Sequence, residues 1–270
     1  MNKSTSTLLW VVAFVLMAAL AIYQRTTGPT YPKSGKVKIS GQEIMYHLPR
    51  SANTGSSKLI ELNVPDNNIV GYVKYKRYKS YDEWQIHQME RSGEMIYGHL
   101  PSQSPAGKVM YEVYLINLNG ENVKLTPEPV VLRFKGEVPA YILIPHIFCM
   151  FLAMVFGMRA GIGSLYKNDS HLYSQSLWAL ILFAIGGALL GPIVQYNAFG
   201  VYWSGWPFGQ DLTDNKTLLS LIMWLIAVLQ IRKHPERRGW VTAATIVMLA
   251  VYLIPHSVLG SEIDYTKMPR

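Results

Sequence analysis

Cysteine is almost absent from this chain of 270 residues, which contains Cys149 alone. An intrachain disulfide is therefore excluded, and packing and hydrogen bonds must hold every part of the fold. Charge is also scarce: Asp, Glu, Lys and Arg make up 16% of the residues, against roughly 25% in a typical soluble domain. No P-loop, nucleophile elbow, HExxH or CxxCH pattern occurs, so none of the enzyme classes that depend on these motifs is indicated.

The charges that are present are concentrated in residues 24–137. Five other stretches contain no Asp, Glu, Lys or Arg, namely residues 8–23, 138–158, 176–195, 217–231 and 240–258. A helix of roughly 20 apolar residues crosses a bilayer, and a charge near its centre costs several kcal/mol. We therefore predict an α+β membrane protein with an N-terminal transmembrane anchor in residues 1–24, a β domain in residues 25–137 and a four-helix transmembrane bundle in residues 138–270.

The first apolar segment has two interpretations. Residues 19–21 (ALA) resemble a signal-peptidase site and follow a hydrophobic core of suitable length. However, the apolar run continues through Ile22 and Tyr23 without the polar region that normally precedes cleavage, so we favour an uncleaved anchor. Either interpretation exports the residues that follow.

The net charge of +8 does not indicate nucleic acid as a partner. No basic helix or aromatic RNA-binding strand motif occurs, and the basic residues lie in the exported domain or at the ends of apolar segments. Short loops rich in Lys and Arg stay on the cytoplasmic side, which places Lys3, Arg159, Lys167 and residues 232–238 inside. Residues 25–137, the loop 196–216 and the C-terminus then lie outside, as expected for a multi-pass protein of the bacterial inner membrane.

Residues 30–135 have a different pattern. Short runs of β-branched and alternating residues recur at 36–39, 43–48, 59–64, 69–78, 84–89, 95–100, 109–117 and 130–134, separated by Gly, Pro, Asn and Asp. Short strands at intervals of about eight to twelve residues predict an antiparallel β-sandwich. Within 69–78 neither face is cleanly apolar, because tyrosines and basic residues occur on both.

This domain resembles the fibronectin type III and immunoglobulin-like modules of exported bacterial proteins. The resemblance rests on an aromatic strand end, a tryptophan, a glycine hairpin and a Pro-Gly turn before a tyrosine strand. The residues concerned are Tyr75, Trp84, Met89, Gly93, Tyr97, Leu100, Pro101, Pro105, Ala106, Gly107, Lys108 and Tyr111. The resemblance implies a sandwich fold and no particular activity, because many functions use this architecture.

Aromatic and histidine side chains in this domain have plain structural interpretations. Trp84, Tyr111 and Tyr114 are expected to pack in its core, with a carbohydrate- or peptide-binding face as the alternative. The spacing of the histidines at 47, 87 and 99 is not that of a metal site, so we expect them on the surface.

The most unusual segment is the loop 196–216, which contains six aromatic residues separated by glycines. Aromatic rings with polar tips favour the membrane–water boundary. We therefore expect this loop to lie at the outer membrane surface, anchored by Tyr202, Trp203, Trp206 and Phe208.

Acidic residues follow in the same outer region. Asp214, or Thr213 beside it, is expected to cap the next helix. Asp211 lacks so simple a role, which makes it the better candidate for binding a ligand or partner. Glu262 and Asp264 would share the outer surface and could complete a polar pocket there, although a solvated acidic tail is the alternative.

An Ile-Pro-His phrase recurs at 144–146 and 254–256. At about 1.5 Å per residue, His146 and His256 both fall toward the outer ends of their helices. Two neutral histidines facing each other could ligate a b-type haem or a transition metal, and the glycines at 186, 187 and 191 would let a flat cofactor approach. The alternative is that each histidine bonds a carbonyl freed by its adjacent proline, or a nearby side chain.

Phrases in the second half of the chain are also similar to an uncharacterised family of bacterial membrane proteins. They are residues 191–195 (GPIVQ), 206–209 (WPFG) with 211–216 (DLTDNK), and 254–257 (IPHS). The resemblance would extend over nearly the whole chain, including the anchor and the β domain, and implies no substrate.

Three classes of function fit these features. We favour a non-enzymatic accessory or scaffold subunit of the cell envelope, which contacts the lipid bilayer and other envelope proteins, because it requires no unobserved cofactor. The second class is a redox subunit that holds haem or a metal between His146 and His256. The third is a small transporter or intramembrane enzyme using the outer acidic residues and histidines, although no internal repeat or catalytic set is recognisable.

Overall fold

The computed structural model describes residues 3–167, 169–255, 260 and 262–267. The chain divides into a helical unit, Met1–Pro29 with Val138–Gly260, and a β unit, Thr30–Glu137 with Ser261–Arg270. The boundary at 137/138 lies where the sequence changes from charged to apolar. Residues 261–270, expected with the membrane domain, group with the β unit instead.

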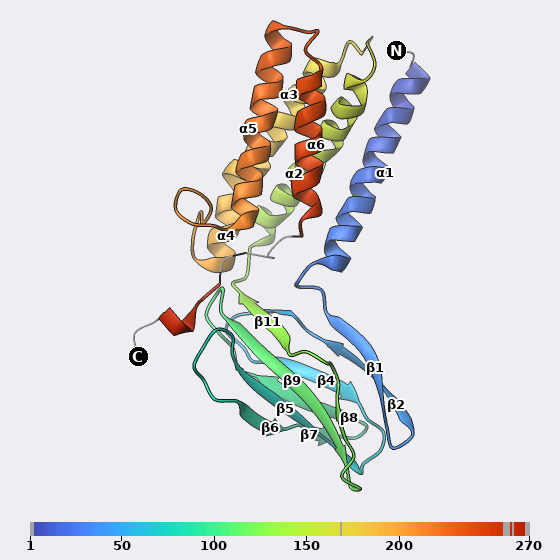
Figure 1. The fold of residues 1–270 in the computed structure, drawn as a ribbon, viewed down its shortest axis with the longest axis vertical. Helices are drawn as coiled ribbons and strands as arrows, with labels where there is room; N and C mark the ends of the chain where they lie inside the picture. Colours follow the sequence, from blue (N-terminus) through green and yellow to red (C-terminus); the bar gives the residue numbers. More distant parts are fainter. Residues whose placement is uncertain (1–2, 168, 256–259, 261, 268–270) are drawn as a thin grey trace. The chain divides into compact units, whose positions relative to one another are not determined.

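The helical unit consists of α1 (Lys3–Thr27), α2 (Ala140–Ser164), α3 (Leu172–Phe183), α4 (Gly191–Phe199), α5 (Leu212–Lys233) and α6 (Gly239–Leu253), which Figure 1 shows together. A π-helical segment, Ala184–Leu190, joins α3 and α4 into one helix from Leu172 to Phe199. Within the described chain, four helices of 22 to 28 residues are long and apolar enough to cross a membrane: α1, α2, Leu172–Phe199 and α5. The apolar helix α6 has 15 residues.

Two helix ends differ from the sequence prediction. Helix α1 extends beyond the apolar run 8–23 to Thr27, and the hydroxyl groups of Thr26 and Thr27 donate to the carbonyls of Ile22 and Tyr23 in its last turn. Helix α6 ends at Leu253 rather than at residue 258, because Ile254 precedes Pro255 and adopts an extended backbone with ψ of 115°. A residue before proline is driven out of the helical region by the proline ring.

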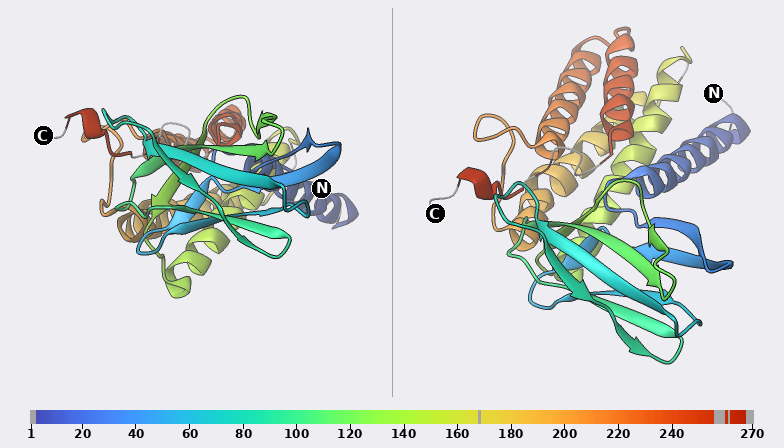
Figure 2. Two further views of the ribbon diagram at one scale, coloured as in Figure 1. Left: turned by 90° about the horizontal axis from the view of Figure 1, so that it is seen from below. Right: turned by 60° about the horizontal axis from the view of Figure 1, so that its bottom comes forward.

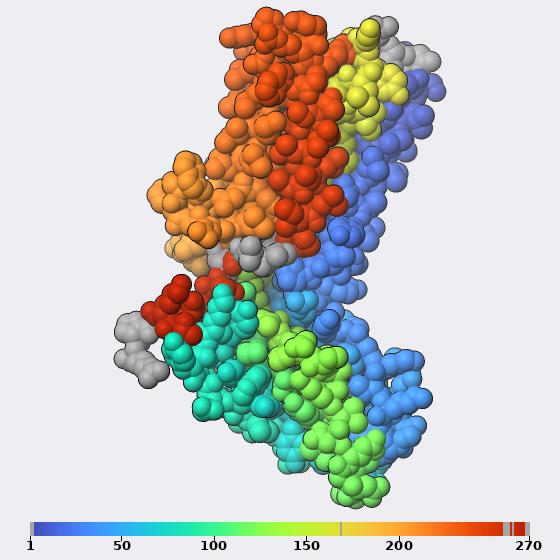
Figure 3. All heavy atoms as spheres, in the orientation of Figure 1, coloured from blue at the N-terminus to red at the C-terminus, as the bar shows by residue number. Residues whose placement is uncertain are grey.

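The outward surface of the helical unit is apolar. Large side chains with 59–65% exposure occur on four helices, among them Phe14, Ile144, Leu189 and Ile246. Small and medium residues fill much of the interior, where Ala153, Ala227 and Ala244 belong to the same buried cluster as the fully buried Trp224. Figure 3 shows α5 and α6 in contact along their sides. A water-soluble helical bundle has the opposite pattern, with polar residues outside.

Side chains at one end of the helical unit join neighbouring helices by hydrogen bonds. Ser6 of α1 meets Arg159 of α2 at 3.4 Å, and Ser164 of α2 meets Thr242 of α6 at 2.7 Å. This end also contains the α5–α6 connection, near the start of α1 (Figure 1). The basic residues that the sequence analysis assigned to one side therefore gather at one end.

The β unit contains β1 (Lys33–Ile39), β2 (Gln42–Leu48), β3 (Ser51–Asn53), β4 (Lys58–Asn63), β5 (Ile69–Arg77), β6 (Gln85–Gln88), β7 (Glu90–Ser92), β8 (Met95–Leu100), β9 (Lys108–Asn117), β10 (Asn122–Lys124) and β11 (Val130–Lys135). A 3-10 turn, Tyr265–Lys267, follows in the tail. The predicted strands are confirmed to within three residues at each end, whereas β3, β7 and β10 were not predicted. These three strands have three residues each, too few to show an alternating pattern.

The strands form three sheets. One has the order β3-β11-β9-β5-β6 with β10 also on β9, the second has the order β4-β8-β7, and β1 and β2 form a hairpin of their own, visible in Figure 2. Among the described strands every pairing is antiparallel except that of β3 with β11. Ser40 and Gly41, at φ of 50° and 75°, make the two-residue turn between β1 and β2, the turn type whose twist suits a hairpin.

One hydrophobic core joins the three sheets. On β5 the inward face is apolar, with Ile69 and Val73 buried on either side of Gly71. A methyl group at Gly71 would come within 2.6 Å of both Ile96 Cδ1 and Met89 Sδ, so side chains of the neighbouring strands fill the space that glycine leaves. Side chains of neighbouring strands therefore complete the apolar inward face of β5. The sequence of β5 alone does not show this.

Tyr111 lies in this core with no exposed surface, and its hydroxyl group donates to the carbonyl of Pro49 at 2.8 Å. The prediction that Tyr111 packs in the core is confirmed. Burial raises the pKa of the Tyr111 phenol well above its ordinary value, so it acts as a neutral donor throughout the physiological range.

The Tyr111→Phe substitution is expected to destabilise the β unit by about 1 kcal/mol, the usual contribution of one buried hydrogen bond. The carbonyl of Pro49 would lose its donor while the ring kept its packing. Chemical denaturation followed by intrinsic fluorescence measures the change. Tyr81→Phe is the control, because Tyr81 is 70% exposed, and an equal loss in both variants would contradict the assignment.

Candidate functional site

His146 lies in α2 and faces the π-helical segment. Its Nδ1 atom is 2.9 Å from the carbonyl oxygen of Gly186. Because a carbonyl only accepts, Nδ1 must carry the proton, which fixes one tautomer and leaves the Nε2 lone pair uncommitted by this bond. His146 thus bonds a carbonyl, but the carbonyl belongs to the π-helical segment and is not one freed by the adjacent Pro145, as the sequence analysis had suggested. His256 lies outside the described residues.

Asp211 is the N-cap of α5 and accepts from the amide of Thr213 at 2.8 Å. The prediction that Asp214 or Thr213 caps this helix, and that Asp211 lacks a structural role, was wrong. The helix begins at Leu212, so its N-cap position falls on Asp211. A capping carboxylate also suits the positive end of the helix dipole.

Asp214 instead holds the aromatic loop in place. One carboxylate oxygen is 2.6 Å from the amide nitrogen of Ser204, 3.2 Å from the Ser204 hydroxyl and 3.0 Å from Nε2 of Gln195. The side chain is 6% exposed. Gly205 allows this approach, since a methyl group there would lie 2.6 Å from Asp214 Cβ. Asp214 thus connects α5, the loop and α4.

The aromatic residues of this loop differ in exposure. Trp206 is 69% exposed and Phe208 84% exposed, whereas Trp203 is half-buried and donates to the carbonyl of Trp206 at 3.1 Å. Tyr202 stacks on Tyr196 with ring centroids 4.3 Å apart. The loop therefore presents large apolar side chains from a backbone that buried aspartates hold.

Lys216, one turn into α5, is 7% exposed. Its ammonium group donates to the carbonyl of Ile254 at 2.7 Å and lies 3.5 Å from that of Pro255. Gln24 of α1 donates to the carbonyl of Tyr252 at 2.9 Å. These carbonyls lie in the last turn of α6 or directly after it, where helical partners are lacking, so side chains of α1 and α5 cap this end.

A buried ion pair at the opposite end was not predicted. Arg159 of α2 and Asp169 of the α2–α3 connection are joined at 2.9 Å with no exposed side-chain surface on either. The Arg159 guanidinium also lies 5.8 Å from the ring centroid of Trp10 in α1. Asp169 lies outside every apolar run and has no motif around it, so no signal in the sequence assigned it a partner.

Glu262, in the tail, belongs to the β unit and forms ion pairs with both Lys79 and Lys108. The amide of Ile263 donates to the carbonyl of Ala106 at 3.2 Å. Burial alone would raise the pKa of Glu262, but the hydrogen bonds and charges of Lys108 and Lys79 together lower it below its ordinary value. The tail is thus docked on the β unit rather than solvated at this point.

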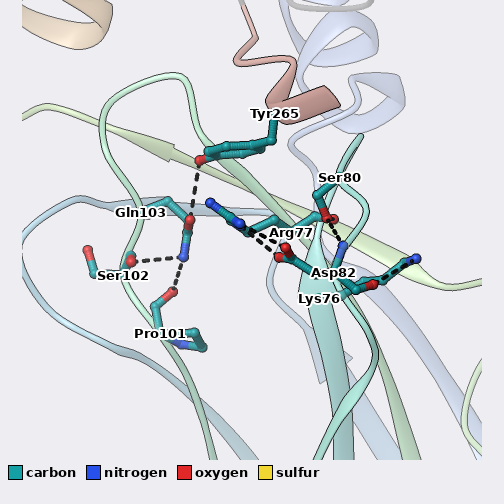
Figure 4. A network of polar contacts seen from close by, with 8 residues as sticks. All are labelled: Lys76, Arg77, Ser80, Asp82, Pro101, Ser102, Gln103 and Tyr265. Carbon is teal, nitrogen blue, oxygen red and sulfur yellow. Dashed lines mark hydrogen bonds and ion pairs between the residues drawn. The ribbon is translucent and has the colours of Figure 1, made fainter. Parts of the chain in front are cut away.

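Tyr265 completes the tail contact, which Figure 4 shows from close by. Its hydroxyl group donates to Gln103 Oε1 at 3.2 Å, and the Arg77 guanidinium lies 4.5 Å from its ring centroid. Arg77 is held in turn by two hydrogen bonds of 2.7 Å to Asp82. The hydrogen bond from Arg77 is the largest cause of the lowered pKa of Asp82.

Acidification is expected to release this tail. Glu262 has a lowered pKa when docked and an ordinary value, near 4.5, when free. A lowered pKa contributes stability above the ordinary value, and this contribution disappears as the pH falls through the docked value. The protection of the Ile263 amide against hydrogen exchange, measured relative to its intrinsic rate at the same pH, should therefore fall below about pH 4.5.

Glu262→Gln is expected to show faster exchange already at neutral pH, with a weaker acid response. Asp264 also has a lowered pKa, mainly through the hydrogen bond from Thr266, so a residual acid response remains. Glu61→Gln, an exposed position on β4, is the control. Unchanged exchange in Glu262→Gln at neutral pH would refute a role for the carboxylate.

Trp84 does not lie in the core, so the prediction for this residue was wrong. It is half-buried, and the ammonium groups of Lys74 and Lys76 lie 4.8 and 5.4 Å from its ring centroid. Tyr114 was also predicted to pack in the core, which is wrong: it is half-buried outside the core cluster, and its hydroxyl group donates to Glu112 at 2.8 Å. The alternating lysines of β5 attract the indole ring to the outer face of the sheet. His47, His87 and His99 are exposed, as predicted.

The predicted site residues thus fall into separate groups. Asp211 and Asp214 meet around Ser204 in the helical unit, whereas Glu262 and Asp264 belong to the β unit. In the described part of the chain, no three His, Cys, Asp or Glu residues are grouped to hold a metal ion. A polar pocket that unites these residues stays a prediction. No protein-family model and no curated protein matches this sequence.

Proposed function

We propose that this chain is a multi-pass protein of the bacterial inner membrane that acts as a non-enzymatic accessory or scaffold subunit. The β unit forms an extracytoplasmic sandwich of the fibronectin type III or immunoglobulin-like kind and contacts other envelope proteins. The observation that carries the membrane part is the apolar outward surface of four helices of spanning length. The bilayer hides this surface from water.

The uncleaved anchor is supported by the packing of α1. Leu9, Ala13 and Met17 are buried, and Ser6 and Gln24 form hydrogen bonds to other helices near its two ends. Cleavage near residue 21 would remove most of these contacts. The first helix is therefore a structural part of the bundle.

The orientation is supported by the segregation of charge within the helical unit. The Lys- and Arg-rich α5–α6 connection lies at the end of the unit where α1 starts and where α2 leads into α3. These are short connections, for which the excess of Lys and Arg marks the cytoplasmic side. The aromatic loop then lies at the outer surface, where Trp206 and Phe208 enter the headgroup region.

The scaffold role is supported by what the polar groups do. Asp211 caps a helix, Asp214 holds a loop, Lys216 caps α6 and Glu262 docks the tail. Each of these four side chains has a structural partner, so each stabilises the fold. The face around Trp84 and Tyr114 presents the two aromatic side chains that partner surfaces favour, and Lys74 and Lys76 beside the indole ring add positive charge to it.

Orientation is tested by labelling single cysteines with a membrane-impermeant maleimide in a Cys149→Ser chain. Ser56→Cys, in an exposed turn of the β unit, is expected to react in cells with a permeable outer membrane. Glu236→Cys, in the α5–α6 connection, is expected to react only after the inner membrane is opened. The reverse pattern would invert the proposed topology.

The scaffold role is tested by crosslinking the full chain in its own membranes. Lys74→Glu with Lys76→Glu should abolish crosslinks that the wild type forms through the β unit. Lys38→Glu with Lys58→Glu changes the charge equally on other strands and should preserve them. Identical crosslinks in both double variants would argue against the Trp84 face.

A redox subunit is the second candidate, favoured by the tautomer of His146. Histidines that ligate iron or transition metals commonly donate Nδ1–H to a carbonyl and present Nε2 to the metal. His146 makes this bond to Gly186, within the segment that contains Gly187 and precedes Gly191. The second ligand would be His256.

Absorption spectra and metal analysis of detergent-purified protein decide between the two candidates. The redox role predicts a Soret band or bound metal that is lost in His146→Ala and His256→Ala and kept in His171→Ala. His171 is the matched control, because it is exposed and directly precedes α3. A colourless, metal-free wild type would eliminate the redox candidate.

A further inference from the structure

The connection between α5 and α6 concentrates positive charge. Within residues 232–238 there are four cations, Arg232, Lys233, Arg237 and Arg238, and one acid, Glu236. Glu236 lies 3.3 Å from His234 Nδ1. The first three cations are exposed and Arg238 is half-buried. Residues 232–238, which comprise the end of α5 and the α5–α6 connection, therefore have a net excess of three positive charges, without counting His234.

A second connection adds to this cluster. The guanidinium group of Arg238 donates to the carbonyl of Tyr166, in the α2–α3 connection. Lys167 follows Tyr166 and is exposed. Asp169, the nearest acid in that connection, is fully buried and paired with Arg159. Its charge is thus neutralised, and Lys167 joins the four cations of the α5–α6 connection.

The backbone of this region is well ordered by local bonds. The amide of His234 donates to the carbonyl of Gln230, and that of Arg237 to the carbonyl of His234, both at 2.9 Å. Arg237 also donates to the Gln230 side chain at 2.7 Å. Arg232 and Lys233 stand in the last turn of α5, where the helix dipole favours cations. The cations are thus presented from a fixed turn.

Exposed apolar residues adjoin the cluster on both helices. Leu229, one turn before Lys233, is 47% exposed, and Trp240, in the first turn of α6, is 40% exposed. Tyr166 is 44% exposed beside Lys167. An anion that binds here therefore meets cations on one side and an apolar helix surface on the other.

We propose that this basic cluster, Lys167 with Arg232, Lys233, Arg237 and Arg238, binds the phosphate headgroup of an anionic phospholipid from the inner leaflet. The inference rests on the membrane insertion and orientation proposed above. A phospholipid satisfies both parts of the surface, because its phosphate pairs with the cations while its acyl chains cover Leu229 and the neighbouring helix faces. A free phosphate would leave the apolar flank in contact with water, and the bilayer excludes a nucleic acid from that flank.

The test measures retained lipid by native mass spectrometry of the full chain, reconstituted in nanodiscs of equal phosphatidylglycerol and phosphatidylcholine. The wild type is expected to retain phosphatidylglycerol preferentially. Each cation near such a surface strengthens anionic lipid binding on the order of fivefold at low salt. Arg232→Gln with Lys233→Gln and Arg237→Gln should therefore reduce the preference at least about tenfold.

The control is Lys33→Gln with Lys38→Gln and Lys58→Gln, which removes the same charge from the β unit. It should retain the full preference. Equal losses in both triple variants would attribute the effect to net charge and overturn the proposal. Competition by inorganic phosphate as effective as that by added phosphatidylglycerol would reassign the cluster to a soluble anion and also overturn it.

Lysines and arginines in loops also direct membrane insertion, and the triple variant would be uninformative if it failed to insert. A second set of measurements therefore does not depend on that variant. Arg232→Lys with Arg237→Lys keeps every charge and should keep the preference, and added salt should weaken lipid retention by the wild type. A wild type without any preference in nanodiscs refutes the lipid site alone. Extraction of the wild type from membranes by alkaline carbonate would instead refute the proposed membrane insertion, so the two failures can be distinguished.

Discussion

Replacing Asp169 with alanine is expected to destabilise the helical unit by about 3–5 kcal/mol, the usual cost of leaving a buried charge unpaired. Arg159 would keep its charge with no exposed side-chain surface, and its Nε atom already has no hydrogen-bond partner in the described structure. The remaining bond, to Ser6 at 3.4 Å, is too long to compensate.

Cys149 provides the measurement. It is the sole cysteine of the chain and lies half-buried in α2, so a thiol-reactive dye reports the opening of the helical unit during a temperature ramp in detergent. Asp169→Ala should become reactive well before the wild type. Glu236→Ala, an exposed acid at the same end of the unit, should not shift the transition measurably.

The double variant Asp169→Ala with Arg159→Met separates pairing from packing. Removing both charges leaves no unpaired group, and methionine fills part of the space of the arginine side chain. Stability should then recover most of what Asp169→Ala lost. If the double variant were less stable than Asp169→Ala, the ion pair itself would not be the source of the effect.

The second large effect is expected at Asp214. Asp214→Ala removes the acceptor for the Ser204 amide, the Ser204 hydroxyl and Gln195. A hydrogen bond to a charged group contributes about 1.5–3 kcal/mol, and the amide of Ser204 would lose its strongest acceptor. We expect a loss of about 2–3 kcal/mol and faster proteolysis within residues 200–210.

Asp211→Ala is the matched comparison, because Asp211 lies three residues away and its main bonds are the helix cap and a longer contact, 3.3 Å, with the Ser204 hydroxyl. That cap contributes about 1 kcal/mol, so Asp214→Ala should be the more damaging change. Asp214→Asn keeps an oxygen acceptor and should fall between wild type and alanine. Equal proteolysis of Asp211→Ala and Asp214→Ala would contradict the role of Asp214 in holding the loop.

The sequence predicted most of the elements because their patterns are local. Uncharged runs gave the apolar helices, and alternation between turn residues gave the longer strands. The end of α6 was missed although its cause is also local: the pair Ile254-Pro255 stops the helix, while the apolar run continues past it. A proline deserves more weight than hydropathy in setting a helix end.

The side-chain partners could not be predicted, because they depend on residues far apart in the chain. Lys216 bonds to Ile254, Glu262 to Lys79 and Lys108, and Tyr111 to Pro49. Trp84 was misplaced for a related reason. An aromatic residue in a strand pattern usually packs inward, and only the neighbouring lysines of β5 show that this ring is held on the outer face.

The docking of the tail has a consequence for how the protein is degraded. The chain passes between its two units at residues 29/30, 137/138 and 260/261. A protease that cuts one of these connections leaves the β unit attached through the others. Even after cuts at the first two, Glu262 and Tyr265 would hold the β unit to the chain that continues from α6. Shedding of the β unit therefore requires three cleavages, or two cleavages and the release of the tail.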